Sequence, residues 1–187
     1  MFTLVFKRLE YCVLKDMKKR VLYSKDSIDR RVKELADILS HDYKGKDVVI
    51  ICVLKGAFIF LADLTRYLEM TYVVDFVRLS SYGSQSESSG TVTVTKDIEV
   101  SIAGRDVIIL EDIVDTGTTL VWLRNMLEKR NPASVKICTL IDKKERRSVE
   151  IDADYVGFDL AEGFVVGYGL DFNEKFRCLP SVYVIEE

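Results

Sequence analysis

The chain has 187 residues and a mass of 21.4 kDa, enough for one domain with a sizeable core and too little for two ordinary domains. Hydrophobic residues make up 48% of it and charged residues 30%, which excludes a disordered chain; charges also interrupt every apolar stretch too early for a membrane-spanning helix. The net charge of -3 and the pI near 5.4 disfavour a protein whose main role is to grip nucleic acid.

The histidine and cysteine content narrows the chemistry. His41 is the only histidine and lies in a polar run, which excludes a zinc site with paired histidines and predicts a solvated helix end. The four cysteines are far apart in the sequence, at Cys12, Cys52, Cys138 and Cys178. Because two of them lie inside apolar runs, we expect reduced, buried thiols and a cytoplasmic protein.

The first residues of the chain are apolar, but charges break the apolar run early. No small-residue cleavage site follows, so the segment makes a poor signal peptide. Because Met17 offers a second plausible start, we expect residues 1–16 to be a dispensable extension and residues 17–187 to form a single domain.

From Ser27 to about residue 145, helical and strand patterns alternate and predict the core of the domain. Ser27 suits the N-cap of the first helix, and Gly45 lies beyond the end of that helix. Apolar runs of strand length occupy residues 48–54, 72–79, 107–110 and 135–141, with helical spacing over 27–39, 56–70 and 118–129. This order predicts an α/β fold with a parallel twisted sheet and helices on both faces.

Two segments depart from this alternation. The lid loop, at about residues 80–95, begins with a polar run of serine and glycine; it fits a flexible hairpin loop and a lid over an active site equally well. Residues 150–187 contain short apolar pieces and no convincing helix. We expect them to form a small hood lobe, together with N-terminal residues, over the binding site.

The most informative segment follows the strand that ends at Leu110. It reads Glu-Asp-Ile-Val-Asp-Thr-Gly-Thr-Thr over residues 111–119. Amides and hydroxyls that open a helix can cradle a phosphate, whereas the adjacent acids Glu111 and Asp112 suit sugar hydroxyls, a metal ion or proton transfer. The combination predicts a ligand with both a phosphate and a polyol, such as a ribose phosphate. The alternative is an ordinary helix cap beside a charged loop.

A second strand end, at Lys55 and Gly56, also offers a cation and free amides. Alone it would be an ordinary turn, but beside the first segment it predicts a second anion site and a substrate with phosphates at two ends. Two other phosphate motifs fail. No glycine-rich run ends in Gly-Lys-Ser/Thr, and Gly167-Tyr168-Gly169 lacks the third glycine and the helix of a dinucleotide fold.

The segment over residues 107–120 resembles the ribose-phosphate signature of type I phosphoribosyltransferases, and the resemblance extends from Met17 to the C-terminus. Within that family the chain is most similar to the hypoxanthine-guanine enzymes. The residues that carry this similarity are Leu54-Lys55-Gly56, Ser81-Tyr82, Glu111 to Thr119, Asp142-Lys143-Lys144 and Phe164 to Glu174. The resemblance implies purine salvage: transfer of phosphoribosyl from phosphoribosyl pyrophosphate to hypoxanthine or guanine, with Mg²⁺, giving IMP or GMP and pyrophosphate.

The resemblance also implies a role for each site residue. Glu111 and Asp112 hold the ribose hydroxyls directly or through Mg²⁺, and Asp171 is a further magnesium-associated carboxylate. Asp115 is the catalytic residue that accepts the proton of the purine's five-membered ring, and it lies within the ribose-phosphate site. The loop around the 5′-phosphate consists of Thr116, Gly117, Thr118 and Thr119. Thr118 stands at a position where related enzymes vary, some carrying a lysine.

The remaining roles concern pyrophosphate, the base and the lid. The resemblance places pyrophosphate on Lys55, Gly56 and Arg177, with a cis peptide bond after Leu54. The base site comprises Lys143, which donates to the 6-oxo group, Phe164, which stacks on the ring, and Val165, whose backbone contacts the pyrimidine edge. The tip of the closing lid comprises Ser81 and Tyr82. The family also implies a homodimer or homotetramer.

Other interpretations stay open from the residues alone. Phe164 could belong to the core, Lys143 to a solvated charged turn, and Asp171 to a turn cap. A non-enzymatic regulator on the same fold, which senses nucleotides and binds RNA, is disfavoured by the acidic charge balance. A phospho-accepting receiver domain is disfavoured by the chain length, the serine-rich loop and the C-terminal segment.

Overall fold

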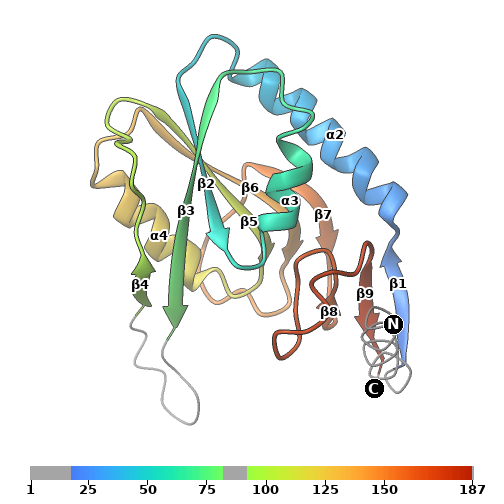
Figure 1. Ribbon diagram of the computed structural model, residues 1–187. Helices are drawn as coiled ribbons and strands as arrows, with labels where there is room; N and C mark the ends of the chain where they lie inside the picture. The colour runs from blue at the N-terminus through green and yellow to red at the C-terminus, as the bar shows by residue number, and fades with distance from the viewer. Residues whose placement is uncertain (1–17, 82–91, 187) are drawn as a thin grey trace, which may run out of the picture.

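The computed structural model describes residues 18–81 and 92–186 of the chain (Figure 1). The helices are α2 (Lys25–Asp42), α3 (Phe58–Leu64) and α4 (Thr118–Glu128). The strands are β1 (Lys19–Tyr23), β2 (Val48–Leu54), β3 (Tyr72–Ser81), β4 (Val92–Lys96), β5 (Asp106–Val114), β6 (Ser134–Lys143), β7 (Tyr155–Leu160), β8 (Val165–Val166) and β9 (Val182–Ile185). The predicted extension, residues 1–16, lies outside the described residues.

A six-stranded sheet forms the centre of the fold, in the order β4-β3-β2-β5-β6-β7. All neighbours pair in parallel except β4, which runs antiparallel to β3 at one edge. Helix α3 connects β2 to β3 and α4 connects β5 to β6, as parallel pairing requires, because a parallel crossover needs about a dozen residues. The carboxyl ends of β2, β5 and β6 therefore lie together at one edge of the sheet.

Helices cover both faces of this sheet, as the sequence predicts (Figure 1). Successive side chains of a strand point to opposite faces, so the apolar run of β2 serves two cores. One core joins α2 and α3 to the side chains of Val48, Ile50 and Cys52. The other joins α4 to the side chains of Val49, Ile51 and Val53.

Several smaller predictions are confirmed. Cys52 and Cys138 are buried free thiols, and His41 lies exposed in the last turn of α2. The only tryptophan, Trp122 in α4, packs against the second core. Within the described ranges, the helices are too short or too polar to cross a bilayer.

Two helix boundaries differ from the predictions. Ser24, not Ser27, caps α2: its hydroxyl accepts a hydrogen bond from the Ser27 amide at 3.2 Å, while the Ser27 hydroxyl donates to the Ser24 carbonyl. The helix predicted over residues 56–70 is shorter, because the amides of Arg66 and Tyr67 bond three residues back and tighten the chain into turns after Leu64.

A second, three-stranded sheet has the order β1-β9-β8 and is antiparallel throughout. It joins the start of the described chain to its end. The segment over residues 150–187 is nevertheless divided: β7 pairs with β6 and extends the central sheet. The expectation that the whole segment forms an appended lobe is therefore wrong, because the short apolar run of β7 matches the free edge of β6.

A buried carboxylate fastens the segment after β4 to the sheet. Asp75 of β3 is only 6% exposed, and its Oδ2 accepts hydrogen bonds from the amides of Glu99 at 2.6 Å and Val100 at 3.0 Å. Burial alone would raise the pKa of Asp75. These amides, the amide of Phe76 and the Lys96 ammonium outweigh that effect and hold the pKa below its ordinary value.

We expect Asp75→Ala to lower the free energy of unfolding at neutral pH by about 2–4 kcal/mol, because the amides of Phe76, Glu99 and Val100 lose a charged acceptor. Asp37→Ala, on the exposed face of α2, is the matched control and should have an effect below about 0.5 kcal/mol. Since the folded-state pKa of Asp75 is depressed, its stabilisation is present above about pH 4 and is lost as the pH falls through the folded pKa. Urea unfolding at several pH values measures the free energy of unfolding and its dependence on pH. Equal losses of stability in Asp75→Ala and Asp37→Ala would contradict the anchoring role.

Candidate active site

Strand β5 continues past Leu110 and carries two acids within it. The predicted strand end at Leu110 is wrong, because the parallel pairing with β6 persists to Val114, which lies opposite Asp142. Glu111 and Asp112 are thus strand residues rather than loop residues. Backbone pairing on the β6 side holds them in place whatever their charge.

Asp112 lies directly beneath the loop that follows β2. A Cβ atom at Gly56 would stand 1.7 Å from the Asp112 Oδ2, so only glycine leaves room for the carboxylate. The peptide bond between Leu54 and Lys55 is cis, as the resemblance implies. The acid pair and the predicted pyrophosphate loop therefore meet at this strand end.

Glu111 lines an open pocket of about 140 Å³, large enough for several water molecules or a small polar ligand. The other lining residues are Ile113, Asp115, Thr116, Gly117, Thr119 and Leu120. Gly117 takes a positive φ of 82° as the N-cap of α4, which starts the helix at the pocket wall. Thr118 is absent from the lining, and its hydroxyl lies 3.1 Å from the Ser148 hydroxyl.

The two strand acids carry unfavourable charge. Burial, followed by the negative charge of Asp112, raises the pKa of Glu111 well above its ordinary value. Burial also raises the pKa of Asp112, despite hydrogen bonds from nearby groups. A divalent cation with bound water would relieve this repulsion, and carboxylate oxygens are the ligands that Mg²⁺ prefers. The pair therefore fits a magnesium ion.

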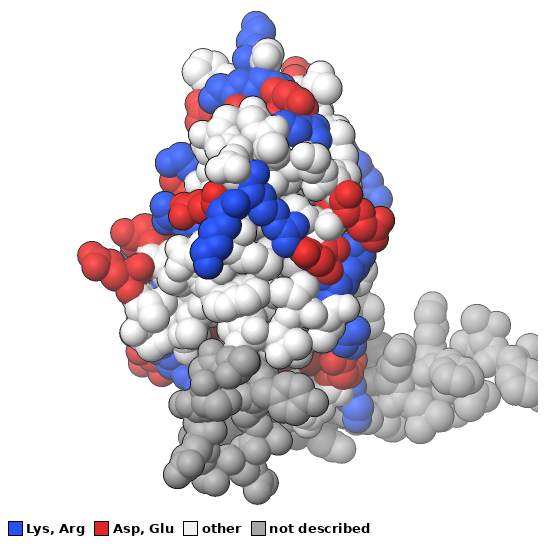
Figure 2. All heavy atoms as spheres, turned by 90° about the vertical axis from the view of Figure 1, so that its left-hand side faces the viewer, with Lys and Arg blue, Asp and Glu red and all other residues white. Residues whose placement is uncertain are grey.

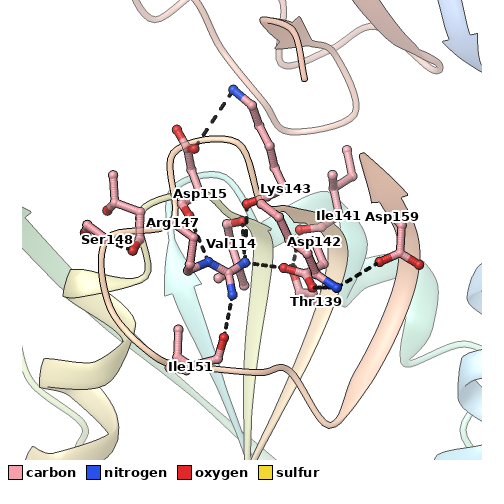
Figure 3. Close-up of polar contacts among 12 residues, drawn as sticks. Val114, Asp115, Thr139, Ile141, Asp142, Lys143, Arg147, Ser148, Ile151 and Asp159 are labelled. Atoms are coloured by element: carbon pink, nitrogen blue, oxygen red, sulfur yellow. Dashed lines mark hydrogen bonds and ion pairs between the residues drawn. The ribbon is translucent and has the colours of Figure 1, made fainter. Parts of the chain in front are cut away.

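Lys143, the last residue of β6, is buried and points at the acid that opens the pocket loop (Figure 3). Its Nζ lies 3.1 Å from Glu145 and 3.9 Å from the Oδ1 of Asp115. The hydrogen bond from Lys143 lowers the pKa of Glu145. The Oδ1 of Asp115 is buried without a hydrogen-bond partner, although Arg146 lies 3.6 Å from the other oxygen. That oxygen is available to accept a proton or a hydrogen bond from a ligand.

The predicted pyrophosphate cations are linked through one acid. Glu174 Oε2 lies 2.8 Å from Lys55 Nζ and 3.4 Å from Arg177 Nη2. Arg177 also pairs with Asp171 at 2.7 Å, and the Glu174 amide donates to the other Asp171 oxygen. Asp171 thus caps a turn and already neutralises an arginine. It fits a metal ion less well than Glu111 does.

Glycine lets the C-terminal segment approach the loop after β2. A Cβ atom at Gly169 would stand 2.1 Å from the Gly56 carbonyl oxygen. The backbone of residues 167–170 therefore passes directly over the Lys55–Gly56 turn. This contact brings the side chains of Lys55 and Arg177 to the same edge of the sheet as the acids of β5.

Phe164 is not a core residue. It is 49% exposed, and its ring meets that of Phe172 edge to face, with 5.5 Å between the ring centroids. Val165, the next residue, is buried in β8 and pairs with Val184 of β9. An exposed aromatic face held by a second ring can stack on a flat ligand.

The predicted lid begins within β3. Ser81 is the last residue of β3, opposite Val92 of β4. Tyr82 lies outside the described residues, as does the rest of the loop up to residue 91.

A family model for the phosphoribosyl transferase domain matches residues 22–173, which is most of the chain. The chain belongs to the phosphoribosyltransferase family. Its sequence is 49% identical over 173 residues to the hypoxanthine-guanine phosphoribosyltransferase of Streptococcus thermophilus, covering 92% of this chain and 96% of that relative. The resemblance drawn from the sequence is confirmed.

Solved structures of phosphoribosyltransferases share the whole fold. A hypoxanthine phosphoribosyltransferase from Staphylococcus aureus superposes with a TM-score of 0.88 at 40% identity, covering 94% of this chain and 95% of that one. The hypoxanthine phosphoribosyl transferase of Trypanosoma cruzi, studied for the role of its C-terminal region in oligomeric state and activity, gives a TM-score of 0.86 at 40% identity. That match covers 91% of this chain and 93% of the other.

Sequence reasoning missed three residues of this phosphoribosyltransferase site. Arg147 is largely buried against the pocket loop, Glu174 joins the two cations, and Phe172 supports Phe164. The spacing of Phe172 behind Phe164 offered a faint signal. For Arg147 and Glu174 no local signal exists, because their partners come from distant segments.

We expect Glu111→Gln to raise the free energy of unfolding of the metal-free protein at mildly alkaline pH, because it removes a charge that burial and Asp112 disfavour. A raised folded-state pKa means that the carboxylate destabilises the fold above that pKa. The advantage of the variant should therefore disappear as the pH falls toward the ordinary value of 4.5. Exposed Glu69→Gln is the control. Urea unfolding at several pH values measures the difference, and a destabilised Glu111→Gln protein would show that the charge is not repelled.

Proposed function

We propose that this chain transfers the phosphoribosyl group of phosphoribosyl pyrophosphate to hypoxanthine or guanine, which yields IMP or GMP and pyrophosphate in purine salvage. The observation that carries the proposal is the pocket itself. It places the half-buried carboxylate of Glu111 beside the residues that open α4. The carboxylate can accept hydrogen bonds from sugar hydroxyls, and the N-terminus of the helix can bind a phosphate.

The sugar phosphate is assigned to this pocket. The 5′-phosphate would accept hydrogen bonds from the amides of Thr116, Gly117, Thr118 and Thr119 and from the hydroxyls of Thr116 and Thr119. Glu111 and Asp112 would hold the ribose hydroxyls. The hydroxyl of Thr118 points at Ser148, so Thr118 would contribute through its amide.

Magnesium is the proposed cofactor, held by Glu111 and Asp112. When bound, the ion neutralises charge on the departing pyrophosphate. Lys55, the amide of Gly56 and Arg177 would bind the same pyrophosphate, and the substrate would then displace Glu174 from its two cations. Asp171 would act mainly by holding Arg177.

The base would lie between Lys143 and Phe164. The Lys143 ammonium donates to a 6-oxo group and repels a 6-amino group, which favours 6-oxopurines. The exposed ring of Phe164 would stack on the base, with the Val165 backbone at its pyrimidine edge. Asp115 would accept the ring proton of the purine, which makes the attacking nitrogen more nucleophilic. Ser81 and Tyr82 would close over the site and exclude water.

Surface charge disfavours the RNA-binding alternative. Figure 2 shows basic and acidic side chains intermingled on the face that carries α4. Arg124 pairs with Glu128 at 3.0 Å there, and Arg130 pairs with Asp97 at 2.6 Å. Such paired arginines offer little free charge to a phosphate backbone. We further propose a cytoplasmic homodimer or homotetramer, in line with the family.

The direct test is an assay of nucleotide formation from phosphoribosyl pyrophosphate, Mg²⁺ and each of hypoxanthine, guanine, xanthine and adenine. We expect IMP and GMP with stoichiometric pyrophosphate, and no product from adenine. Asp115→Asn should lower kcat by about 10²-fold if Asp115 is the proton acceptor. Unchanged turnover in that variant would remove the role. A protein that binds RNA but releases no pyrophosphate would overturn the proposal.

Lys143→Ala tests the base site separately. We expect the KM for hypoxanthine to rise by about tenfold or more, because a buried charge-assisted hydrogen bond is lost, with a much smaller change in the KM for phosphoribosyl pyrophosphate. Lys136→Ala is the matched control on the same strand, since Lys136 is half-exposed and pairs with Asp154 at 2.7 Å. Equal increases in the two KM values would contradict the position assigned to Lys143.

A further inference from the structure

The loop between β6 and β7 carries an arginine that is buried against the pocket loop. The Arg147 side chain is only 14% exposed, and its guanidinium pairs with the buried carboxylate of Asp142 (Figure 3). It also donates to the main-chain carbonyls of four residues, Val114, Asp115, Lys143 and Ile151. The distance from its Nε to the Asp115 carbonyl is 3.0 Å. One side chain thus joins the ends of β5 and β6.

The next residue extends the same contact. The Ser148 amide donates to the Thr116 carbonyl at 3.0 Å, and the Ser148 hydroxyl lies 3.2 Å from that oxygen. Packing adds to these bonds, because a Cβ atom at Gly117 would stand 2.6 Å from the Ile151 side chain. The carbonyls of Asp115 and Thr116 are therefore both fixed on the β6–β7 loop.

Peptide planarity turns this anchoring into a constraint on the amides. In a trans peptide the N–H points opposite to the carbonyl of the same unit. With the Asp115 carbonyl held by Arg147, the amide of Thr116 must face away from the guanidinium. With the Thr116 carbonyl held by Ser148, the amide of Gly117 must face away from Ser148. Thr116 and Gly117 both line the pocket.

We propose that Arg147 and Ser148 are positioning residues for the phosphate of the substrate. They act through the main chain: by holding two successive carbonyls, they aim the Thr116 and Gly117 amides into the pocket. This inference rests on the proposed function, because it takes the pocket to hold a phosphate monoester. The bonds from Arg147 to Asp142 and to the Lys143 carbonyl also fix the phosphate loop relative to the strand that carries Lys143.

The test uses Arg147→Lys, which keeps the charge and loses the planar fork that reaches several acceptors at once. The probe is ribose 5-phosphate, titrated by calorimetry, with steady-state kinetics alongside. We expect the Kd for ribose 5-phosphate and the KM for phosphoribosyl pyrophosphate to rise about tenfold, the factor of one charge-assisted hydrogen bond. The KM for hypoxanthine should change by less than about threefold. Arg124→Lys, in an exposed ion pair on α4, is the matched control and should leave all values unchanged.

Ser148→Ala is the milder second variant and decides the matter if Arg147→Lys does not fold. It keeps the amide bond to Thr116 and loses the hydroxyl, so we expect a rise of about threefold in the same Kd. A folded variant with an unchanged Kd, or with both KM values raised equally, would overturn the positioning role. Wild-type protein that fails to bind ribose 5-phosphate would instead overturn the proposed function, and the two failures are thereby distinct.

Discussion

The active site depends on two adjacent carboxylates, one buried and one half-buried, at the end of a buried parallel strand. Glu111 and Asp112 stay in β5 because backbone pairing with β6 continues to Val114. Burial raises the pKa of both carboxyls, and the charge of Asp112 raises that of Glu111 further, so two ionised carboxylates here are an unfavourable arrangement of charge. Cations and hydroxyl groups relieve it, and the positive end of α4 lies a few residues further along the chain.

Strand geometry gives the two acids different neighbours. Glu111 lines the pocket beside α4, whereas Asp112 lies beneath Gly56. A single dipeptide therefore connects the sugar-phosphate pocket with the loop after β2. The proposed chemistry breaks a bond between a ribose and a pyrophosphate, and both halves of that substrate would lie within reach of one strand end.

Sequence patterns predict the parts of this structure that local chemistry decides. The strand Val48–Leu54 is predicted to the residue because a run buried on both faces has no polar interruption. The end of β5 is not predicted correctly, because acidic residues at positions 111 and 112 look like the start of a loop. Ser24 and Ser27 both suit a helix cap, and only the observed hydrogen bonds distinguish them.

Within the site, the same division holds. Residues that line the pocket follow one another in the chain and were predicted together, whereas Lys143 and Arg147 stand in a charged cluster that looks solvated. Their burial depends on Asp142 and on the fold of the β6–β7 loop over the pocket, contacts that no local pattern reveals. Tertiary packing, not residue type, buries these two charged side chains beside the site.

The central claim is that one strand end holds both the ribose and its phosphate. A crystal structure of the protein with ribose 5-phosphate and Mg²⁺ tests it most directly. The account predicts the phosphate at hydrogen-bond distance from the amides of Thr116 and Gly117, with the ribose hydroxyls or the metal ion on Glu111. A ligand bound with its phosphate elsewhere, and Glu111 left in water, would contradict it.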